Sequence, residues 1–511
     1  MKYPRSTKLD RRLWAMQLGL AAGLALLFTA ALLWGLRGVT PARAEPDTRY
    51  VDGHTGGDDS DCTNPADPCA TIGHALSQAA NGDEIRVAEG TYTETLDIVG
   101  TTVTLKGGYE AAGWTRDISA HPTIVDADGA DDSVISIFPY VEVTIEGFTV
   151  QGANHTGVDS FGGISIDRAM VIISGTIVQN NQAQANGGGI YIQDDGESAS
   201  LALINSSVLN NRAYEGGGIN ASGWPTVTLK SVEIKGNTAQ GSGGGINAGY
   251  VSITDSHIIS NTAGSTGGGI HTSVAYIYNS EISGNEANGV GDIGGGGIAV
   301  SNVRLHLQDS VVSNNRAVGT VHNGPSGIAA GNADVSIINT RISDNKIGTL
   351  AVALWSSSFT ITNSLVVNND GAGIGADENP VTGTLMNTTI AGNGGNGIRL
   401  TGGDVRITNS ILWGNAFDNN CGGNCTITYS DVGTGDTAGT DNISADPEFV
   451  DAANGDYHLG VGSPCIDKGT RAGAPEADIE GTPRDAAPDM GAYEWTGFRI
   501  FLPLTLSDFG P

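Results

Sequence analysis

The sequence is poor in basic residues and in charge generally. Its 511 residues contain 25 Lys and Arg against 55 Asp and Glu, and charged residues make up 16%. The formal net charge of −30 leaves no basic stripe to contact phosphates, so nucleic acid is excluded as an expected partner. After residue 36 no apolar run is long enough to cross a bilayer, so contact with a membrane is expected only through the N-terminus.

The N-terminal segment has the layout of an export signal. Five basic residues precede residue 13, Leu18 to Leu36 is uncharged, and Ala42-Arg43-Ala44 forms a small-x-small cleavage site. This pattern predicts a signal peptide over residues 1–44. An uncleaved signal anchor is the alternative, because 19 apolar residues can also span a bilayer. Both interpretations predict an extracellular or cell-surface protein.

The chain has only five cysteines, and four of them form two close pairs. Cys62 and Cys69 lie seven residues apart, and Cys421 and Cys425 lie four apart. In an exported chain these spacings predict two local disulfides, and neither has the CxxC or histidine spacing of a zinc site. Cys465 is the odd cysteine, and an alternative is that it pairs with Cys421 or Cys425.

Glycine is abundant, with 76 residues, and it belongs to an internal repeat. The motif is [ND]-[ST]-x-apolar-x-x-x-Asn, with Ile or Leu eight residues before the closing asparagine (position −8) and an aliphatic residue three before it (position −3). We interpret the asparagines as a structural ladder that passes amide hydrogen bonds between repeats. They are Asn181, Asn211, Asn237, Asn261, Asn285, Asn315, Asn345, Asn369, Asn393 and Asn415.

The offsets within the repeat predict three short strands and three bends. Positions −10 and −8 point the same way from one strand, the Asx-Ser/Thr pair bends the chain, and the −3 aliphatic lies on a second strand. A glycine run followed by isoleucine opens a third strand. Repeats of 22–30 residues with this content predict an all-β parallel β-helix of about 13 three-strand coils over residues 83–432.

Both ends of such a solenoid need covering. Residues 45–82 are predicted to form an N-terminal cap with a short amphipathic helix between Ala70 and Ala80. Residues 433–495 lose the glycine-isoleucine signature and become rich in Pro and Asp, which predicts an irregular C-terminal cap. Residues 496–511 form a tail.

Several motifs resemble known families. The stretch from Cys69-Ala70-Thr71-Ile72 to Gly90-Thr91-Tyr92 resembles the opening of bacterial right-handed β-helix proteins of the pectin-lyase-like superfamily. The GG-x-I and I-x-x-N elements resemble polymorphic outer-membrane protein repeats, with aliphatic residues in place of the usual phenylalanine. Asp446-Pro447-Glu448-Phe449-Val450 and Asp489-Met490-Gly491-Ala492-Tyr493-Glu494 resemble the choice-of-anchor domain of secreted bacterial surface proteins. The resemblance implies right-handed coils and a role outside the cell.

The superfamily includes polysaccharide lyases and hydrolases, which need clustered carboxylates on one outward face. The outward positions of the repeat, both after the glycine-isoleucine pair and between −10 and −8, contain no acid in the coils we aligned, so no catalytic residue is assigned. After glycine-isoleucine they form a stripe of Tyr191, Asn220, Asn247 and His271. Aromatic and amide groups in a row suit sugars, so the stripe is a candidate ligand-binding site; ordinary exposed strand residues are the alternative.

Asp126, Asp128, Asp131 and Asp132 form an acidic loop. Hard oxygen ligands at alternate positions are typical of a calcium site, whereas Asp-Gly is also common turn chemistry. Taken together, the sequence predicts an exported scaffold that binds polysaccharide or a cell-surface glycan, with calcium as the one cofactor considered. The alternative is a carbohydrate-active enzyme, either a polysaccharide lyase or a glycoside hydrolase, whose acids lie on loops.

Overall fold

The computed structural model describes residues 45–157, 160–196, 199–289, 294–319, 324–376, 381–422, 424–435 and 437–497. The chain divides into two units, residues 1–45 and 46–511, and the description concerns the second unit. The predicted leader and residues 498–511 of the predicted tail lie outside the described residues. Within those ranges, no helix is both long and apolar enough to span a membrane.

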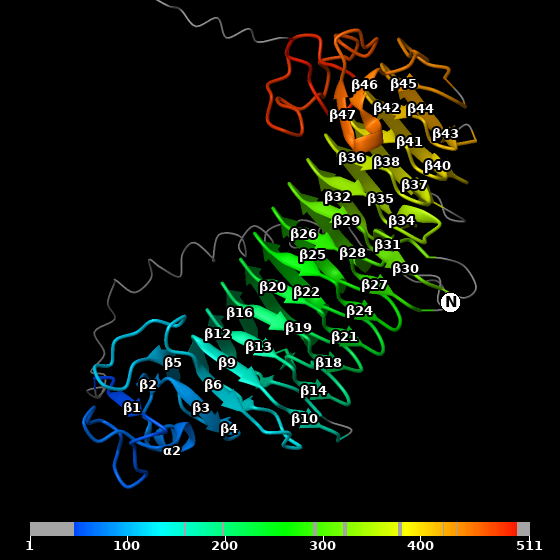
Figure 1. The fold of residues 1–511 in the computed structure, drawn as a ribbon. Helices are drawn as coiled ribbons and strands as arrows, with labels where there is room; N and C mark the ends of the chain where they lie inside the picture. Colours follow the sequence, from blue (N-terminus) through cyan, green and yellow to red (C-terminus); the bar gives the residue numbers. More distant parts are fainter. Residues whose placement is uncertain are drawn as a thin grey trace, which may run out of the picture. The chain divides into compact units, whose positions relative to one another are not determined.

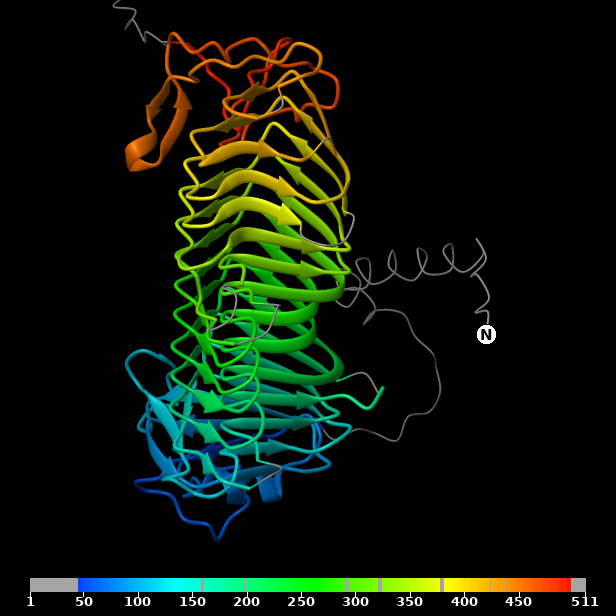
Figure 2. The ribbon, with the colours of Figure 1, turned by 90° about the vertical axis from the view of Figure 1, so that its right-hand side faces the viewer.

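The second unit is a parallel β-helix, as predicted (Figures 1 and 2). Each strand pairs in parallel with its equivalent in the next coil, so Ile246 lies opposite Ile270, and Ile270 lies opposite Ile298. The all-β fold class is therefore confirmed. The coil number differs slightly from the expected 13, because the sheet that contains the −3 residues has 14 strands within the described part of the chain.

Three parallel sheets form the sides of the solenoid, and we name them sheets A, B and C. Sheet A contains β1 Thr48–Val51, β2 Glu84–Ala88, β4 Leu96–Ile98, β5 Val103–Tyr109, β7 Ile135–Ile137, β8 Glu142–Glu146, β11 Ile164–Asp167, β12 Met170–Ser174, β15 Ile190–Gln193, β16 Ser200–Ile204, β19 Ile219–Lys230, β22 Ile246–Thr254, β25 Ile270–Tyr278, β28 Ile298–Gln308, β31 Ile328–Gly331, β32 Asp334–Ile338, β34 Leu350–Trp355, β35 Ser358–Thr362, β37 Ala372–Ala376, β38 Val381–Met386, β40 Asn396–Leu400, β41 Gly403–Thr408, β43 Phe417–Asn420 and β44 Cys425–Thr428. Sheet B contains β3 Gly90–Thr93, β6 Thr123–Asp126, β9 Phe148–Gln151, β13 Ile177–Gln179, β17 Ser207–Leu209, β20 Glu233–Lys235, β23 His257–Ile259, β26 Glu281–Ser283, β29 Val311–Ser313, β33 Arg341–Ser343, β36 Leu365–Val367, β39 Thr389–Ala391, β42 Ile411–Trp413 and β45 Asp431–Val432. Sheet C contains β10 Asn154–His155, β14 Gln182–Ala183, β18 Arg212–Ala213, β21 Thr238–Ala239, β24 Thr262–Ala263, β27 Glu286–Ala287 and β30 Arg316–Ala317.

Strands β19, β22, β25 and β28 differ from the three-strand coil that the sequence predicts. In each of them the glycine-isoleucine strand of one coil and the first strand of the next form a single strand. In neighbouring coils the same two segments are separate strands, for example β15 and β16. The passage is regular in β22 and β25, whereas β19 bulges between Ala221 and Thr226 and β28 bulges between Val300 and Arg304. The four strands therefore form one broad stretch of sheet A.

Stacked isoleucine and leucine side chains form the core inside the sheets. Ile253 at position −8 has no exposed surface, nor does Ile277, its partner in the next coil. Because equivalent positions stack at the strand spacing of about 4.8 Å, the two residues contact along the axis of the solenoid. Burial of these columns supplies the apolar area that stabilises the fold.

The ten asparagines form a continuous ladder beside this core. The Oδ1 of Asn261 accepts hydrogen bonds from the backbone N–H and from the Nδ2 of Asn237, both at 3.0 Å. The Nδ2 of Asn261 also donates to the carbonyl of Ile234 at 2.9 Å. The same pattern links Asn181 through to Asn393, and the carboxylate of Asp418 ends the ladder by accepting from Asn415.

The Asx-Ser/Thr pair builds a second ladder at the other bend. The Asx residue adopts a left-handed backbone, as at Asp255 and Asn279, which these side chains tolerate. The hydroxyl that follows then bridges coils: the backbone N–H of Ser256 donates to the Oγ of Ser280 at 3.1 Å, and that Oγ donates to the carbonyl of Tyr278. The motif therefore encodes the bend and the coil-to-coil contact together.

The N-terminal end is covered by a helix and a disulfide loop. Helix α2 spans Ile72–Gln78, is shorter than the stretch the sequence suggested, and packs against β1, β2 and β4. The predicted disulfides Cys62–Cys69 and Cys421–Cys425 are both present. The loop closed by the first one pairs with the outer edge of β1, because the backbone N–H of Tyr50 donates to the Cys62 carbonyl and Tyr50 accepts from Cys69. This loop hides an otherwise open strand edge.

The C-terminal segment packs along the outside of sheet B. A hairpin of β46 Phe449–Asp451 and β47 Asp456–Leu459, joined by the 3-10 helix η1 Ala452–Asn454, lies beside the last coils (Figure 2). Outward positions of sheet B that are charged in earlier coils, such as Glu233 and Lys235, become the buried Leu365 and Val367 where this segment covers them. The change from charged to apolar residues therefore marks the docking surface.

Buried polar contacts fix this docking. The guanidinium of Arg484 donates to the Glu494 carboxylate and to the Oδ1 of Asn363, both at 2.9 Å. Asn363 is the left-handed Asx residue of the bend between β35 and β36, so a residue of the repeat motif binds the C-terminal segment. Removing one partner of such a buried pair typically costs about 3–5 kcal/mol.

Cys465 is a free, buried cysteine, and its Sγ donates to the carboxylate of Asp431 at 3.2 Å. The alternative pairing of Cys465 with Cys421 or Cys425 is therefore wrong, because those two cysteines are bonded to each other. Burial raises the pKa of Asp431 to about 6 and that of Asp489, in the same docked segment, to about 7.

The core assignment predicts the effect of a charge at position −8. Replacing Ile253 by Asp buries an unpaired carboxylate between stacked isoleucines, so the free energy of unfolding should fall by about 4 kcal/mol or more. The matched control is Ser252→Asp, at the adjacent position that points outward. Thermal unfolding followed by circular dichroism measures both. Equal melting temperatures for the two variants would contradict the column assignment.

The raised carboxyl pKa values predict how the C-terminal segment responds to pH. A carboxyl group with a raised pKa in the folded state binds more protons there than in the unfolded state. Its stabilising contribution is complete below pH 4 and is lost as pH rises through about 6 and 7 for Asp431 and Asp489. The segment should therefore unfold at a lower temperature at pH 8 than at pH 5, and the variant carrying Asp431→Asn and Asp489→Asn should lose most of this difference. Scanning calorimetry at both pH values tests it; a segment that is more stable at pH 8 would contradict the assignment.

Candidate functional site

The predicted stripe is aligned as expected but is not an exposed surface. Tyr191, Asn220, Asn247 and His271 are successive register partners in sheet A. Tyr191 and Asn220 are only 6% and 5% exposed, and the Tyr191 ring stacks on Phe161 with centroids 3.9 Å apart. The expectation that these side chains face solvent is therefore wrong for half of the stripe.

The glycine run explains this burial. Each coil folds back over the residue that follows isoleucine, so the first glycine of the run lies directly on that side chain. A Cβ on Gly243 would come 2.6 Å from the Cβ of Asn247 and 2.4 Å from the carbonyl oxygen of Ile246, and the φ of Gly243 is +68°. Only glycine fits there. The outward face of this strand is thus covered by the chain's own backbone.

The buried stripe continues as a polar network. The Nδ1 of His271 lies 2.8 Å from the Oδ1 of Asn247, and the Nδ2 of Asn247 donates to the Glu215 carboxylate at 3.5 Å. Glu215 also accepts from the backbone N–H of Ser242 at 2.8 Å. Burial lowers the pKa of His271 and raises that of Glu215. These contacts hold one coil against the next, so they contribute to the stability of the fold.

The structure does not gather the four aspartates of the acidic loop around a common point. The carboxylate of Asp126 accepts from the backbone N–H of Asp128 and from Gln151, and that of Asp131 accepts from the backbone and hydroxyl of Thr156. In the described ranges the one group of three potential metal ligands within 4.8 Å is Cys62, Cys69 and His74, in which both cysteines are disulfide-bonded. Asp126 and Asp131 therefore hold this loop against the residues of the next coil.

Strands β22, β25 and β28 lie side by side in sheet A (Figure 1), and their broad outward face carries a different set of side chains. Tyr250, Tyr276, Tyr278 and His306 project outward from three successive coils and are half-buried; we call them the aromatic band. Ser252, Tyr276 and His306 are register partners, and the residues between them in each strand, such as Ile277, point into the core. The alternation of a strand places all four rings on one side.

The rings of the aromatic band form a contiguous surface. Ring centroids are 6.0 Å apart for Tyr250 and Tyr276, 6.2 Å for Tyr276 and His306, and 5.2 Å for Tyr278 and His306, with tilts between 41° and 48°. Arg304 fixes the central ring by donating to the Tyr276 hydroxyl at 3.3 Å, and it is itself paired with Asp334 at 3.1 Å. The rings are therefore held in place before any ligand arrives.

Trp224 extends this surface toward the N-terminus. Its side chain is 60% exposed and its ring lies over Gly249, where an added Cβ would be 3.1 Å from the indole Cε3. Burial raises the pKa of the Tyr250 and Tyr278 hydroxyls, so both stay protonated and can donate hydrogen bonds at neutral pH. Exposed aromatic faces edged by hydroxyl donors suit an amphipathic ligand such as a sugar ring.

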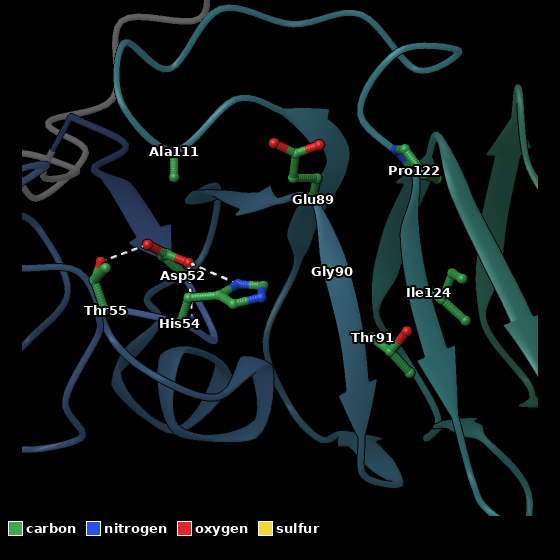
Figure 3. A pocket seen from close by; sticks show the side chains of 9 residues that line it. All are labelled: Asp52, His54, Thr55, Glu89, Gly90, Thr91, Ala111, Pro122 and Ile124. Atoms are coloured by element: carbon green, nitrogen blue, oxygen red, sulfur yellow. Dashed lines mark hydrogen bonds and ion pairs between the residues drawn. The ribbon is translucent and has the colours of Figure 1, made fainter.

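A cavity of about 550 Å³ lies at the N-terminal end, between the loop after β1 and strands β3 and β6 (Figure 3). Asp52, His54 and Glu89 line one side, and Pro122 and Ile124 line another. A Cβ added to Gly90 would lie 3.2 Å from the His54 ring, and the φ of +142° at this position favours glycine.

Two carboxylates of this cavity are held by hydrogen bonds. Asp52 accepts from the backbone N–H of His54 at 3.0 Å and from the Thr55 hydroxyl, and the Glu89 carboxylate lies 3.1 Å from the Nδ1 of His121. Carboxylates with nearby imidazoles are groups that general acid–base catalysis uses. The cavity therefore supplies two acids from segments that precede the first full motif.

The sequence contained a signal for the aromatic band that a search for acids did not use. Relative to their closing asparagines, Tyr250, Tyr276 and Tyr278 occupy positions −11, −9 and −7, and His306 occupies −9 in the following coil. Aromatic enrichment at these outward offsets in consecutive repeats marks the surface. Nothing in the repeat points to Asp52 or Glu89, because both lie before the first full motif.

Comparison with known proteins supports the fold. Residues 273–435 match the family model for a right handed beta helix region, which together with the parallel pairing confirms the right-handed β-helix class. No curated protein matches the chain. Solved structures similar to it include the pectate lyase Pel9A (15% identity, 88% of this chain and 97% of that chain, TM-score 0.30), XylC in complex with xylose (10%, 88% and 98%, 0.35) and a GH136 lacto-N-biosidase from Eubacterium ramulus (11%, 70% and 65%, 0.32). TM-scores this low carry no argument about the chemistry of this chain.

Proposed function

We propose that this protein is an exported bacterial β-helix scaffold that binds carbohydrate through the aromatic band outside the cell or on its surface. The observation that carries the proposal is the contiguous set of rings of Tyr250, Tyr276, Tyr278 and His306 across three coils. Their fixed spacing along the solenoid suits a repeating polymer. Export rests on the signal pattern of residues 1–44, and surface attachment on the resemblance of residues 433–495 to choice-of-anchor domains. The likeness of the repeats to polymorphic outer-membrane proteins belongs to the same proposal.

The band suits this role better than the stripe that the sequence suggested. A ligand can reach the half-buried rings of the band, whereas Tyr191 and Asn220 are covered by the glycine runs that precede them. Replacing stripe residues by alanine would therefore disturb packing, and it would not test binding. In the band, by contrast, the inward neighbours carry the core and the outward rings are available for contact.

Removing two rings of the band should weaken carbohydrate binding. The variant Tyr276→Ala with His306→Ala should bind any glycan recognised by the parent at least about fivefold more weakly, because each ring contact contributes about 0.5–1.5 kcal/mol. A glycan array identifies the ligand, and titration calorimetry measures the loss.

Tyr214→Ala is the matched control, since Tyr214 is an exposed tyrosine (53%) outside the band. This control should bind like the parent, and both variants should keep the parent's circular dichroism spectrum. Unchanged affinity in the Tyr276 and His306 variant would refute the band as the binding surface.

The second candidate function is a glycoside hydrolase that uses the cavity at the N-terminal end. It is favoured by the two carboxylates Asp52 and Glu89 at one cavity, both on loops or strand ends (Figure 3). Hydrolysis needs one carboxyl group as acid and another as base or nucleophile.

If the chain hydrolyses a polysaccharide, Glu89→Gln should lower kcat about 100-fold or more, because it removes a proton-transfer group but keeps the shape. Thr91→Ala, at the same cavity, is the control and should keep most of the activity. Reducing-end assays on a panel of neutral and acidic polysaccharides measure both. A parent protein without turnover on the whole panel rejects the second candidate and leaves the scaffold proposal standing.

A further inference from the structure

The aromatic band is one end of a longer track on sheet A. Going toward the N-terminus from Tyr250, its register partners are Thr226 in β19, Ser200 in β16 and Met170 in β12. The parallel row from Ser252 passes through Thr228 and Ala202 to Ile172. These residues all point outward, so one continuous face connects β12 to β28.

The far end of this track has its own cavity. A space of about 250 Å³ is lined by Tyr140, Glu142, Arg168 and Met170, among others. The Tyr140 side chain is 70% exposed and the Arg168 guanidinium lies 5.9 Å from its ring centroid. Met170 and Ile172, at 46% and 45% exposed, continue the apolar surface from the cavity onto β12.

The middle of the track carries small side chains, most of them with hydroxyl groups. Between Met170 and Tyr250 the outward side chains are those of Ser200, Thr226 and Thr228 together with Ala202, all of them small. Three strand spacings separate Met170 from Tyr250, which is about 14 Å. A ligand that touches both ends must therefore be an extended polymer that lies along the solenoid axis.

Charge decides which class of polymer fits. Both arginines of the track are already paired: Arg304 with Asp334 at 3.1 Å, and Arg168 with Asp167 at 2.9 Å. Asp195 lies 3.7 Å from Arg168 as well. Lys230, in the row that leads to Tyr278, adds a positive charge to this face. With 55 acidic against 25 basic residues in the whole chain, the surrounding field is negative and repels a polyanion. An uncharged chain with apolar faces and hydroxyl edges meets no such penalty.

We infer that the track binds a neutral polysaccharide chain along its length, and that the cavity between Tyr140, Arg168 and Met170 is a second sugar subsite. This inference rests on the proposed function, because the aromatic band is the first subsite. Tyr140 stacks on one sugar ring while the band holds others, and the serine and threonine floor offers hydrogen bonds between them. A single polysaccharide chain that occupies both ends binds more tightly than a short sugar that occupies one, because the second contact becomes intramolecular.

Chain length is the variable that tests the inference. The probes are cellobiose with cellohexaose, xylobiose with xylohexaose, and hexagalacturonate as the charged comparison. Titration calorimetry on residues 45–511, the chain without its predicted signal peptide, measures the affinity for each. In at least one neutral series the hexamer should bind about tenfold tighter than the dimer, because only the hexamer reaches both subsites. Hexagalacturonate should bind more weakly than the neutral hexamer.

Variants at Tyr140 locate the second subsite. Tyr140→Asn removes the ring and suits the left-handed backbone at this position, where φ is +65°. It should remove most of the hexamer's advantage and leave the dimer's affinity unchanged. Tyr140→Phe keeps the ring and should keep the advantage, and Tyr214→Asn should have no effect.

Each result separates the two proposals. Equal affinity for dimer and hexamer, or an unchanged hexamer affinity in Tyr140→Asn, overturns the second subsite but leaves binding at the band intact. Preference for hexagalacturonate overturns the neutral class. Absence of binding to both neutral series overturns this inference, and a glycan array that also finds no ligand overturns the proposed function itself.

Discussion

The stacking of identical positions from one coil to the next is the constraint on which the rest of the structure depends. Parallel pairing fixes the register, and the asparagine ladder enforces it, because each amide can satisfy its partner only when the coils align. A one-residue slip in a strand would turn core isoleucines outward and polar side chains inward. The same register that aligns the core also aligns the outward side chains, so equivalent outward positions of successive coils form columns on the surface.

Two breaks in this regularity create the candidate sites. Where the two strands of sheet A merge into one, in β19, β22, β25 and β28, the outward face becomes broad enough to present several rings together. Where the repeat has not yet begun, the loop after β1 and the bend at Gly90 leave a cavity with two carboxylates. At a third deviation, the apolar residues Leu365 and Val367 stand where earlier coils have charged residues, and the C-terminal segment packs on them. The candidate sites therefore lie where the repeat deviates.

The sequence predicted the repeating part of the fold because a strict period leaves few geometric solutions. The isoleucine column, the asparagine ladder and the bend at the Asx-Ser/Thr pair are all encoded in one short motif. The exposure of Tyr191 and Asn220 was not predictable from strand alternation, because it depends on how a glycine run folds over its own coil. Tyr276 and His306 of the aromatic band occupy the same offset in successive repeats, but their contact with Tyr250 and Tyr278 depends on two segments merging into one strand, which the motif does not encode. The acidic loop and the cavity at Asp52 lie outside the repeat, where local sequence does not fix which side chains meet.

The central claim is that a neutral polysaccharide lies along the outward face of sheet A. The most direct measurement is a crystal structure of the mature chain in complex with the neutral hexasaccharide that binds most tightly. The account predicts sugar rings over Tyr250, Tyr276 and His306, with the chain running parallel to the solenoid axis toward Tyr140. Sugar bound only in the cavity beside Asp52 and Glu89, with the aromatic band bare, would contradict it.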